Sequence, residues 1–144
     1  MFTHVYRRTI EWGECDPAGI VFYPRFLEMF DAATGCLFEA ASGLPRAALI
    51  RHYDILGWPM VSSQVDFRAT ASFDDRVDIH SVVRRLGRTS LEINHELRRG
   101  DLLCVAGTEV RVWARHGVEG QQVIPTPLPD LLRRQLSGLE ENEA

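Results

Sequence analysis

Residues 11–26, with the sequence EWGECDPAGIVFYPRF, decide the fold because they join a tight turn to the start of a helix. The Asp-Pro and Ala-Gly pairs suit neither a strand nor the interior of a helix, so they predict a loop that carries Asp16. Pro24 favours the first turn of a helix, where its missing N–H group would have no intrahelical partner. We therefore predict a shaped loop with a carboxylate on it, followed directly by a helix N-terminus.

A long helix is predicted beyond this loop, because the apolar residues from position 23 onward follow the spacing of one helical face. Gly43 and Pro45 end the pattern, as is typical of a helix C-terminus. The apolar face is wide and rich in Phe and Leu, so we expect the helix to be deeply buried against a sheet. The face comprises Phe26, Leu27, Phe30, Ala33, Thr34, Leu37, Phe38 and Ala41.

Most of the remaining chain alternates apolar and polar residues, which is typical of strands with one buried face. The order of one strand, a buried helix and a run of antiparallel strands predicts one α+β domain over residues 1–144. We expect residues 137–144 to form a flexible acidic tail. Strands are expected within residues 2–12, 61–69, 77–83, 91–97 and 103–113, and short helices at residues 44–53 and after Thr126.

The composition is that of an ordinary globular protein, with 45% hydrophobic and 25% charged residues. A formal net charge of −4 argues against general binding to nucleic acid, which needs clustered cations. The three cysteines are widely spaced and lack a C-x-x-C pair, so we expect neither a disulfide framework nor a metal site. No apolar run approaches the ~20 residues that cross a bilayer, and the N-terminal residues lack the apolar segment of a signal peptide. We therefore expect a reduced, cytoplasmic protein without a membrane span.

The run WGECDPAGIVFYPRFLEMFDAA, residues 12–33, resembles the N-terminal signature of hotdog-fold acyl-CoA thioesterases, closest to the 4-hydroxybenzoyl-CoA thioesterase branch. The resemblance continues along nearly the whole chain. Its further segments are GLP at residues 43–45, PMVS at 59–62, TASFDD at 70–75 and EVRVWA at 109–114.

This resemblance implies a hotdog fold, in which an antiparallel sheet of about five strands wraps around one long central helix. It also implies hydrolysis of an aromatic acyl-CoA similar to 4-hydroxybenzoyl-CoA, or of a short-chain acyl-CoA, to the free acid and CoA. No cofactor is implied, because coenzyme A is part of the substrate. We expect a homo-oligomer, a dimer that pairs further into a tetramer, with an active site between subunits and a second copy of the chain covering a sheet edge.

The resemblance assigns the catalytic roles to the opening loop. Asp16 matches the family's catalytic carboxylate, which would attack the thioester carbonyl or deprotonate a water molecule. The main-chain N–H of Tyr23 would stabilise the oxyanion at the helix N-terminus, and we expect Pro24 to hold Tyr23 in an extended conformation. Gly19 would let the loop pass close to the thioester. On the residues alone, Asp16 and Gly19 could also be ordinary turn formers.

Four further residues are candidates for the acyl pocket. Asp31 matches an aspartate that approaches the phenolic end of the acyl group in the resembling enzymes; the alternative is a boundary residue paired with a cation or with solvent. Trp58 stands where those enzymes carry a small polar residue, and a large ring would reshape the pocket, which puts the 4-hydroxybenzoyl substrate in question. Ser62 and Ser63 would line the pocket or bind the attacking water, and the alternative is two ordinary strand serines.

A group of arginines is the candidate site for the phosphates of CoA. Arg84, Arg85 and Arg88 lie within five positions, and the resemblance places CoA near this strand end. Guanidinium groups suit phosphate recognition. The alternative is a solvated face of the protein.

Two other functions fit the same sequence. A broader short-chain thioesterase, of the type associated with the cell envelope, would differ mainly in the acyl pocket around Trp58. A hotdog protein that binds an acyl-CoA or an acyl carrier without cleaving it would have no need of Asp16.

Overall fold

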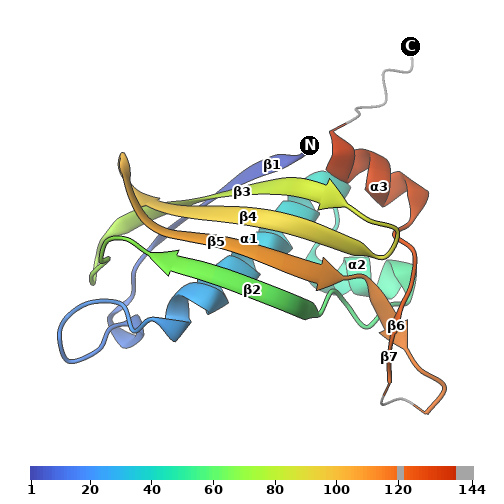
Figure 1. The fold of residues 1–144 in the computed structure, drawn as a ribbon, viewed down its shortest axis with the longest axis horizontal. Coiled ribbons are helices and arrows are strands. Elements are labelled where there is room, and N and C mark those ends of the chain that lie inside the picture. The colour runs from blue at the N-terminus through green and yellow to red at the C-terminus, as the bar shows by residue number, and fades with distance from the viewer. Residues whose placement is uncertain (120–121, 139–144) are drawn as a thin grey trace.

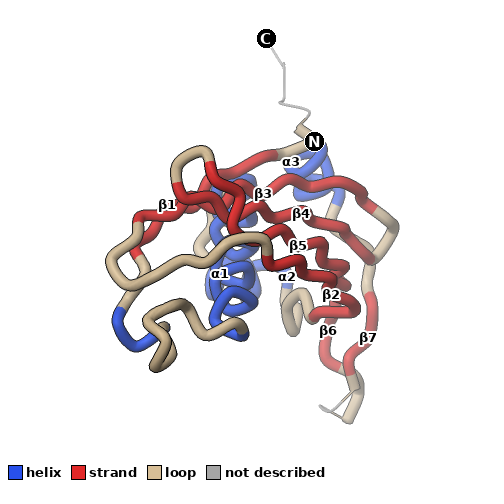
Figure 2. The backbone as a smooth tube through the Cα atoms, turned by 60° about the vertical axis from the view of Figure 1, so that its left-hand side comes forward, coloured by secondary structure: helices blue, strands red, loops and turns tan. Residues whose placement is uncertain are grey.

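The computed structural model describes residues 1–119 and 122–138. A five-stranded antiparallel sheet, in the order β1-β3-β4-β5-β2, curves over the long helix α1 (Figure 1). Figure 2 shows α1 lying against one face of this sheet. This is the predicted arrangement of an antiparallel sheet around one central helix. The strands are β1 (Thr3–Thr9), β2 (Met60–Phe67), β3 (Arg76–Leu86), β4 (Ser90–Arg99) and β5 (Leu102–Val112).

Helices and two short strands complete the described part of the chain. No helix among the described residues is long and apolar enough to cross a membrane. The helices are α1 (Pro24–Ser42), α2 (Arg46–Tyr53), α3 (Asp130–Ser137) and the 3-10 helix η1 (Trp12–Glu14). The short strands β6 (Ala114–His116) and β7 (Val123–Pro125) pair in a separate two-stranded sheet.

Several predicted elements differ from the structure in their bounds, and β3 extends to Leu86 instead of residue 83. The first strand ends at Thr9 because the chain turns into η1, so the prediction of a strand up to residue 12 was wrong. The β6–β7 pair was not predicted, since strands of three residues have too little periodicity to detect. Ser137 belongs to α3, and the rest of the predicted acidic tail, apart from the C-cap Gly138, lies outside the described residues.

The buried face of α1 follows the predicted helical spacing except at Leu27 and at Ala41, which is only half-buried. Leu27 is 37% exposed rather than buried. Met29 is buried instead, although the sequence pattern did not include it. Each fully buried apolar side chain stabilises the fold by about 1.5–3 kcal/mol, so this face holds α1 firmly against the sheet. The buried residues of α1 are Phe26, Met29, Phe30, Ala33, Thr34, Leu37 and Phe38.

Gly107 of β5 allows α1 to approach the sheet closely. A Cβ atom at this position would lie only 2.8 Å from Cε2 of Phe30. The ring of Phe30 also stacks on the neighbouring His95 of β4, with centroids 4.9 Å apart. Phe30 therefore fills a space that exists only because position 107 has no side chain.

Strand β2 is an edge of the sheet and lies largely in the open. The predicted alternation of buried and exposed residues is not observed, because every residue of β2 is exposed except Val65, which is half-buried. β5 covers only one side of β2 through its ladder of hydrogen bonds. The other side offers unpaired backbone groups to a partner.

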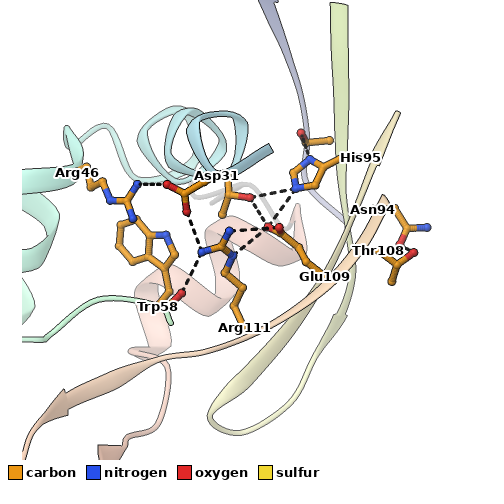
Figure 3. Close-up of polar contacts among 10 residues, drawn as sticks. Asp31, Arg46, Trp58, Asn94, His95, Thr108, Glu109 and Arg111 are labelled. Atoms are coloured by element: carbon orange, nitrogen blue, oxygen red, sulfur yellow. Dashed lines mark hydrogen bonds and ion pairs between the residues drawn. The ribbon is translucent and has the colours of Figure 1, made fainter. Parts of the chain in front are cut away.

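A buried carboxylate, Glu109 of β5, ties α1 to the sheet (Figure 3). Thr34 of α1 donates its hydroxyl to Oε1 of Glu109. His95 places Nε2 3.1 Å from the same oxygen, and its Nδ1 lies 2.7 Å from the hydroxyl of Ser81 on β3. Arg111 donates Nε and Nη2 to the two carboxylate oxygens, at 3.0 and 3.2 Å. Glu109 of β5 thus connects the central helix with β4 directly and with β3 through His95.

The pKa of Glu109 reflects two opposing effects. Burial raises the pKa because it penalises the charged form, but hydrogen bonds from His95 and Arg111 outweigh burial and lower the pKa to about 2. A carboxyl group whose pKa is depressed in the folded state stabilises the fold at pH values above its unfolded pKa. This stabilisation is lost as the pH falls from about 4.5 toward 2.

Glu109→Gln is expected to lower the free energy of unfolding at pH 7 by about 3–5 kcal/mol, because it leaves Arg111 buried beside an uncharged amide. Between pH 4.5 and 2 the wild type should lose stability more steeply than the variant. Urea unfolding at several pH values, followed by circular dichroism, measures both effects. Glu28→Gln, which removes an exposed ion pair with Arg25, is the control and should cost less than about 1 kcal/mol. If the free energy of unfolding varied with pH in the same way for wild type and Glu109→Gln, the lowered pKa of Glu109 would be contradicted.

Candidate active site

The segment between η1 and α1 forms a short hairpin that carries Asp16. Cys15 and Val21 form an isolated antiparallel bridge, and the N–H of Asp16 donates to the carbonyl of Ile20 at 2.9 Å. The N–H of Gly19 donates to the carbonyl of Asp16, also at 2.9 Å. Gly19 has a φ of 83°, a left-handed conformation that favours glycine. The turn itself therefore accounts for Gly19.

Glu14 fixes this hairpin to the rest of the protein. Its carboxylate accepts hydrogen bonds from the guanidinium of Arg8 on β1 and from the main-chain N–H of Glu11. Its carbonyl accepts the N–H of Phe22 at 2.9 Å, which closes the hairpin directly before the helix. The segment that holds Asp16 therefore also holds the N-terminus of α1.

Asp16 lies in a cavity of about 370 Å³. Its Oδ1 accepts the main-chain N–H of Ala18 at 2.8 Å, which orients the carboxylate. Trp12 and Phe73, two aromatic side chains that are 76% and 51% exposed, meet edge to face across this cavity with centroids 5.4 Å apart. Cys15, Pro17 and Gly19 complete its lining. The carboxylate of Asp16 therefore lies in an open, largely apolar hollow.

Tyr23 is the N-cap residue of α1, and its conformation differs from the prediction. Its φ of −52° and ψ of −36° are helical, so the expectation that Pro24 holds it extended was wrong. The helical turn begins early because the carbonyls of Phe22 and Tyr23 already accept the N–H groups of Arg25 and Phe26, at 2.9 and 3.2 Å. Among the described residues, the N–H of Tyr23 itself donates to no carbonyl or side chain.

This free N–H has a defined chemical character. The first N–H groups of a helix have no intrahelical acceptor and lie at the positive end of the helix dipole. Such a position can stabilise a developing negative charge on an oxygen atom. The Tyr23 side chain points away from the core and packs on Phe22 and Phe67.

Asp31 is the α1 residue expected at the far end of an acyl group, and it forms two ion pairs. Arg46 of α2 places Nη1 3.1 Å from Oδ2, and Arg111 of β5 places Nη1 3.0 Å from Oδ1 (Figure 3). The pairing with cations, which was the alternative considered for Asp31, is therefore present. Its side chain remains 43% exposed, so an incoming group can still reach it.

Trp58 is buried rather than lining an open pocket. Its ring packs at a tilt against Phe38 and stacks on Trp113, with centroids 4.4 and 6.0 Å apart, and the guanidinium of Arg46 lies 5.0 Å from its centroid. Its indole N–H has no hydrogen-bond partner among the described residues. The ring of Trp58 thus packs against the guanidinium of Arg46, which in turn forms an ion pair with Asp31.

The two serines of β2 face opposite sides of the sheet. Ser63 pairs with Glu109, whose side chain lies on the α1 side, and so shares that side. Ser62 pairs with Val110 and faces away from α1. Only Ser63 therefore lies on the same side of the sheet as Asp31.

The structure also separates the three candidate arginines for CoA. A register shift between Val83 and Arg85 interrupts the β3–β4 ladder. Arg84 lines a hollow of about 350 Å³ on the outer face of the sheet, whereas Arg85 lines a different hollow near the β3–β4 turn. Arg88 lies exposed in that turn. None of the three lines the cavity that contains Asp16.

Several residues near these sites were not singled out from the sequence. Arg46 and Arg111 flank Asp31, and Glu14 anchors the hairpin of Asp16. The burial of Arg111 could have been predicted from the alternation along β5, since Arg111 lies on the same face of the strand as the buried Val105 and Gly107. No group of three His, Cys, Asp or Glu side chains within residues 1–119 and 122–138 could hold a metal ion.

Proteins of similar sequence are thioester hydrolases. The sequence model of the thioesterase superfamily matches residues 18–106. A 4-hydroxybenzoyl-CoA thioesterase from Pseudomonas sp. is 33% identical over 126 residues, which cover 84% of this chain and 89% of the relative. A 1,4-dihydroxy-2-naphthoyl-CoA hydrolase from Rippkaea orientalis is 27% identical over 139 residues, covering 96% of this chain and 98% of the relative.

Solved structures agree with these matches. An Asp-to-Asn variant of 4-hydroxybenzoyl-CoA thioesterase, complexed with 4-hydroxybenzoyl-CoA, superposes with a TM-score of 0.86 at 29% identity and covers 94% of this chain and 99% of its own. A gentisyl-coenzyme A thioesterase gives a TM-score of 0.80 at 28% identity, covering 93% and 99%. The chain therefore belongs to the thioesterase superfamily and is a thioester hydrolase with the hotdog fold.

Proposed function

We propose that the protein hydrolyses a hydroxylated aromatic acyl-CoA, similar to 4-hydroxybenzoyl-CoA, to the free acid and CoA. The relatives support an aromatic acyl group, since their names specify 4-hydroxybenzoyl, gentisyl and 1,4-dihydroxy-2-naphthoyl thioesters. One structural observation carries the proposal. The carbonyl of Glu14, in the hairpin that presents Asp16, accepts the N–H of Phe22, so this hairpin is fixed directly before the free N–H of Tyr23 at the start of α1.

Asp16 is proposed as the group that starts the reaction. Its carboxylate attacks the thioester carbon to form a mixed anhydride and release CoA, or it removes a proton from a water molecule that attacks. Only Oδ1 accepts a main-chain hydrogen bond from the hairpin, so Oδ2 is available for this step. The negative charge that develops on the carbonyl oxygen is stabilised by the N–H of Tyr23, a contribution of about 2.7–4 kcal/mol in comparable sites.

The acyl group is proposed to lie between two protomers that pair along β2. This edge strand is exposed and carries apolar side chains at Met60, Val61 and Phe67. Pairing two such edges satisfies their free backbone groups and brings the α1–β2 side of one protomer toward its partner. The Asp16 cavity of one chain and the Asp31 region of its partner would then form one site. Two dimers would join into the expected tetramer.

The phosphates of CoA are proposed to meet arginines near the β3–β4 turn. Arg85 and Arg88 lie at this turn and are exposed. Arg84 lies on the outer face of the sheet and is the weakest of the three candidates, because its hollow is separate from that of Arg85.

Asp16→Asn is expected to lower kcat by about a hundredfold to ten-thousandfold, because the amide neither attacks the thioester nor accepts a proton. The asparagine carbonyl can still accept the N–H of Ala18, so fold and melting temperature should be unchanged. A thiol-trapping assay for released CoA measures the loss. Asp101→Asn, in the exposed β4–β5 turn, is the matched control. Unchanged turnover of every accepted thioester by Asp16→Asn would refute the role of Asp16.

Hydroxylated aryl-CoA thioesters are expected to be preferred over other acyl-CoA thioesters. We expect kcat/KM to fall in the order 4-hydroxybenzoyl-CoA, benzoyl-CoA, and a short aliphatic acyl-CoA, since a hydroxyl hydrogen bond to a charged group contributes about 1.5–3 kcal/mol. Steady-state assays over this panel measure the order. Equal values across the three thioesters would favour a broad short-chain thioesterase, and tight binding without CoA release would favour a binding protein.

Met60→Lys combined with Val61→Lys is expected to convert the oligomer to monomers, because two rows of cations would face each other at the β2 edge. Turnover should fall with dissociation, since the proposed site needs both chains. Light scattering after gel filtration measures the mass and separates dimer from tetramer. Val118→Lys is the control, because Val118 is 98% exposed in the segment between β6 and β7. A double variant that keeps the wild-type mass would exclude this interface.

A further inference from the structure

Arg111 is a buried cation whose contacts run from the core to the surface carboxylate of Asp31. The side chain of Arg111 is 4% exposed, and Figure 3 shows it between Glu109 and Asp31. Its Nη1 lies 3.0 Å from Oδ1 of Asp31 and 3.3 Å from the carbonyl of Trp58. The hydrolysis proposed above assigns no task to Arg111.

The orientation of Arg111 is set by Glu109 rather than by Asp31. Nε and Nη2 form a bidentate pair with the carboxylate of Glu109, which fixes the plane of the guanidinium. Thr34 and His95 hold Glu109 from its other side. The remaining nitrogen, Nη1, is thereby directed at Asp31. A lysine could not reproduce this geometry, because it has a single charged nitrogen.

Stability alone is a weak reason for such a buried cluster. Replacing a buried ion pair with apolar residues of similar volume is often neutral or stabilising. The cluster of Arg111, Glu109, Asp31 and Arg46 is balanced in formal charge, and its exposed end consists of Asp31 and Arg46. A rigid, charge-balanced support that ends at one accessible carboxylate is suited to positioning that carboxylate.

Asp31 keeps capacity for a further hydrogen bond. The two arginines each contact a different carboxylate oxygen, and a carboxylate has about four acceptor sites in all. A hydroxyl group on the acyl moiety can donate to a remaining site and accept an N–H of Arg46. An unsubstituted ring can do neither.

We propose that Arg111 is a positioning residue for substrate selection, which holds Asp31 so that it binds a hydroxyl group at the far end of the acyl moiety. This inference rests on the proposed action on aryl-CoA thioesters. It assigns selectivity to a residue that the substrate does not contact.

The test measures binding in the Asp16→Asn protein, so that no turnover is needed. Isothermal titration gives the dissociation constants of 4-hydroxybenzoyl-CoA and benzoyl-CoA. We expect the hydroxylated thioester to bind about tenfold or more tightly. Adding Arg111→Lys should abolish most of this preference, as should adding Asp31→Asn. Adding both should remove no more than either alone, because they act through one contact.

Two further variants separate positioning from a general structural effect. Arg7→Lys makes the same change in the exposed Arg7–Asp78 ion pair and should keep the full preference. Asp31→Glu keeps the charge at an exposed helix position, where the fold tolerates it, but displaces the carboxylate by one methylene. It should lose the preference even if Arg111→Lys fails to fold.

Three outcomes would overturn the inference. They are equal binding of the two thioesters by the parent protein, a preserved preference in Arg111→Lys or Asp31→Glu, and an equal loss of affinity for both thioesters in Arg111→Lys. If the preference behaves as expected but the wild type releases no CoA from either thioester, the hydrolysis proposal fails while the role of Arg111 stands.

Discussion

The attachment of α1 to the sheet is the constraint on which the rest of the structure depends. Apolar burial supplies most of its strength, but the contacts of Glu109 determine where along the sheet the helix sits. A carboxylate in the core is tolerated because Arg111, His95 and Thr34 satisfy it. Since the free N–H of Tyr23 and the carboxylate of Asp31 both lie on α1, a shift of the helix within one protomer would move both groups.

The same helix serves two separate purposes along its length. Its first turn provides the free N–H of Tyr23, which requires no special side chain. Two turns later it provides Asp31, whose carboxylate depends on cations from α2 and β5. The hairpin of Asp16 is anchored independently, through Glu14 and Arg8 of β1. The carboxylates of Asp16 and Asp31 thus rest on different supports, so either can vary without loss of the other.

Much of the fold could be predicted from the sequence, because long elements have strong periodicity. The helical spacing from Phe26 to Phe38 and the alternation in β3 and β4 are both observed. The burial of β2 was misjudged because this strand lies at an edge of the sheet, where β5 pairs with only one side of it. The periodicity of a sequence predicts which residues share one face of a helix or strand, but it does not predict whether another element covers that face.

The candidate site was less accessible to sequence reasoning. Asp16 and Tyr23 were found through a family resemblance, whereas turn chemistry alone would have explained Asp16. Glu109 and Arg111 were overlooked because charged residues are normally expected outside. Arg46 could not be paired with Asp31 from the sequence, because only the packing of α2 on α1 brings them together.

The close seat of Phe30 on Gly107 restricts how this part of the protein can change over evolutionary time. Because the ring occupies the place of a missing Cβ atom, any larger residue at position 107 needs a smaller one at position 30. The two positions are 77 residues apart in the chain and yet must mutate as a pair. Homologues that enlarge one of them should therefore carry a compensating reduction at the other.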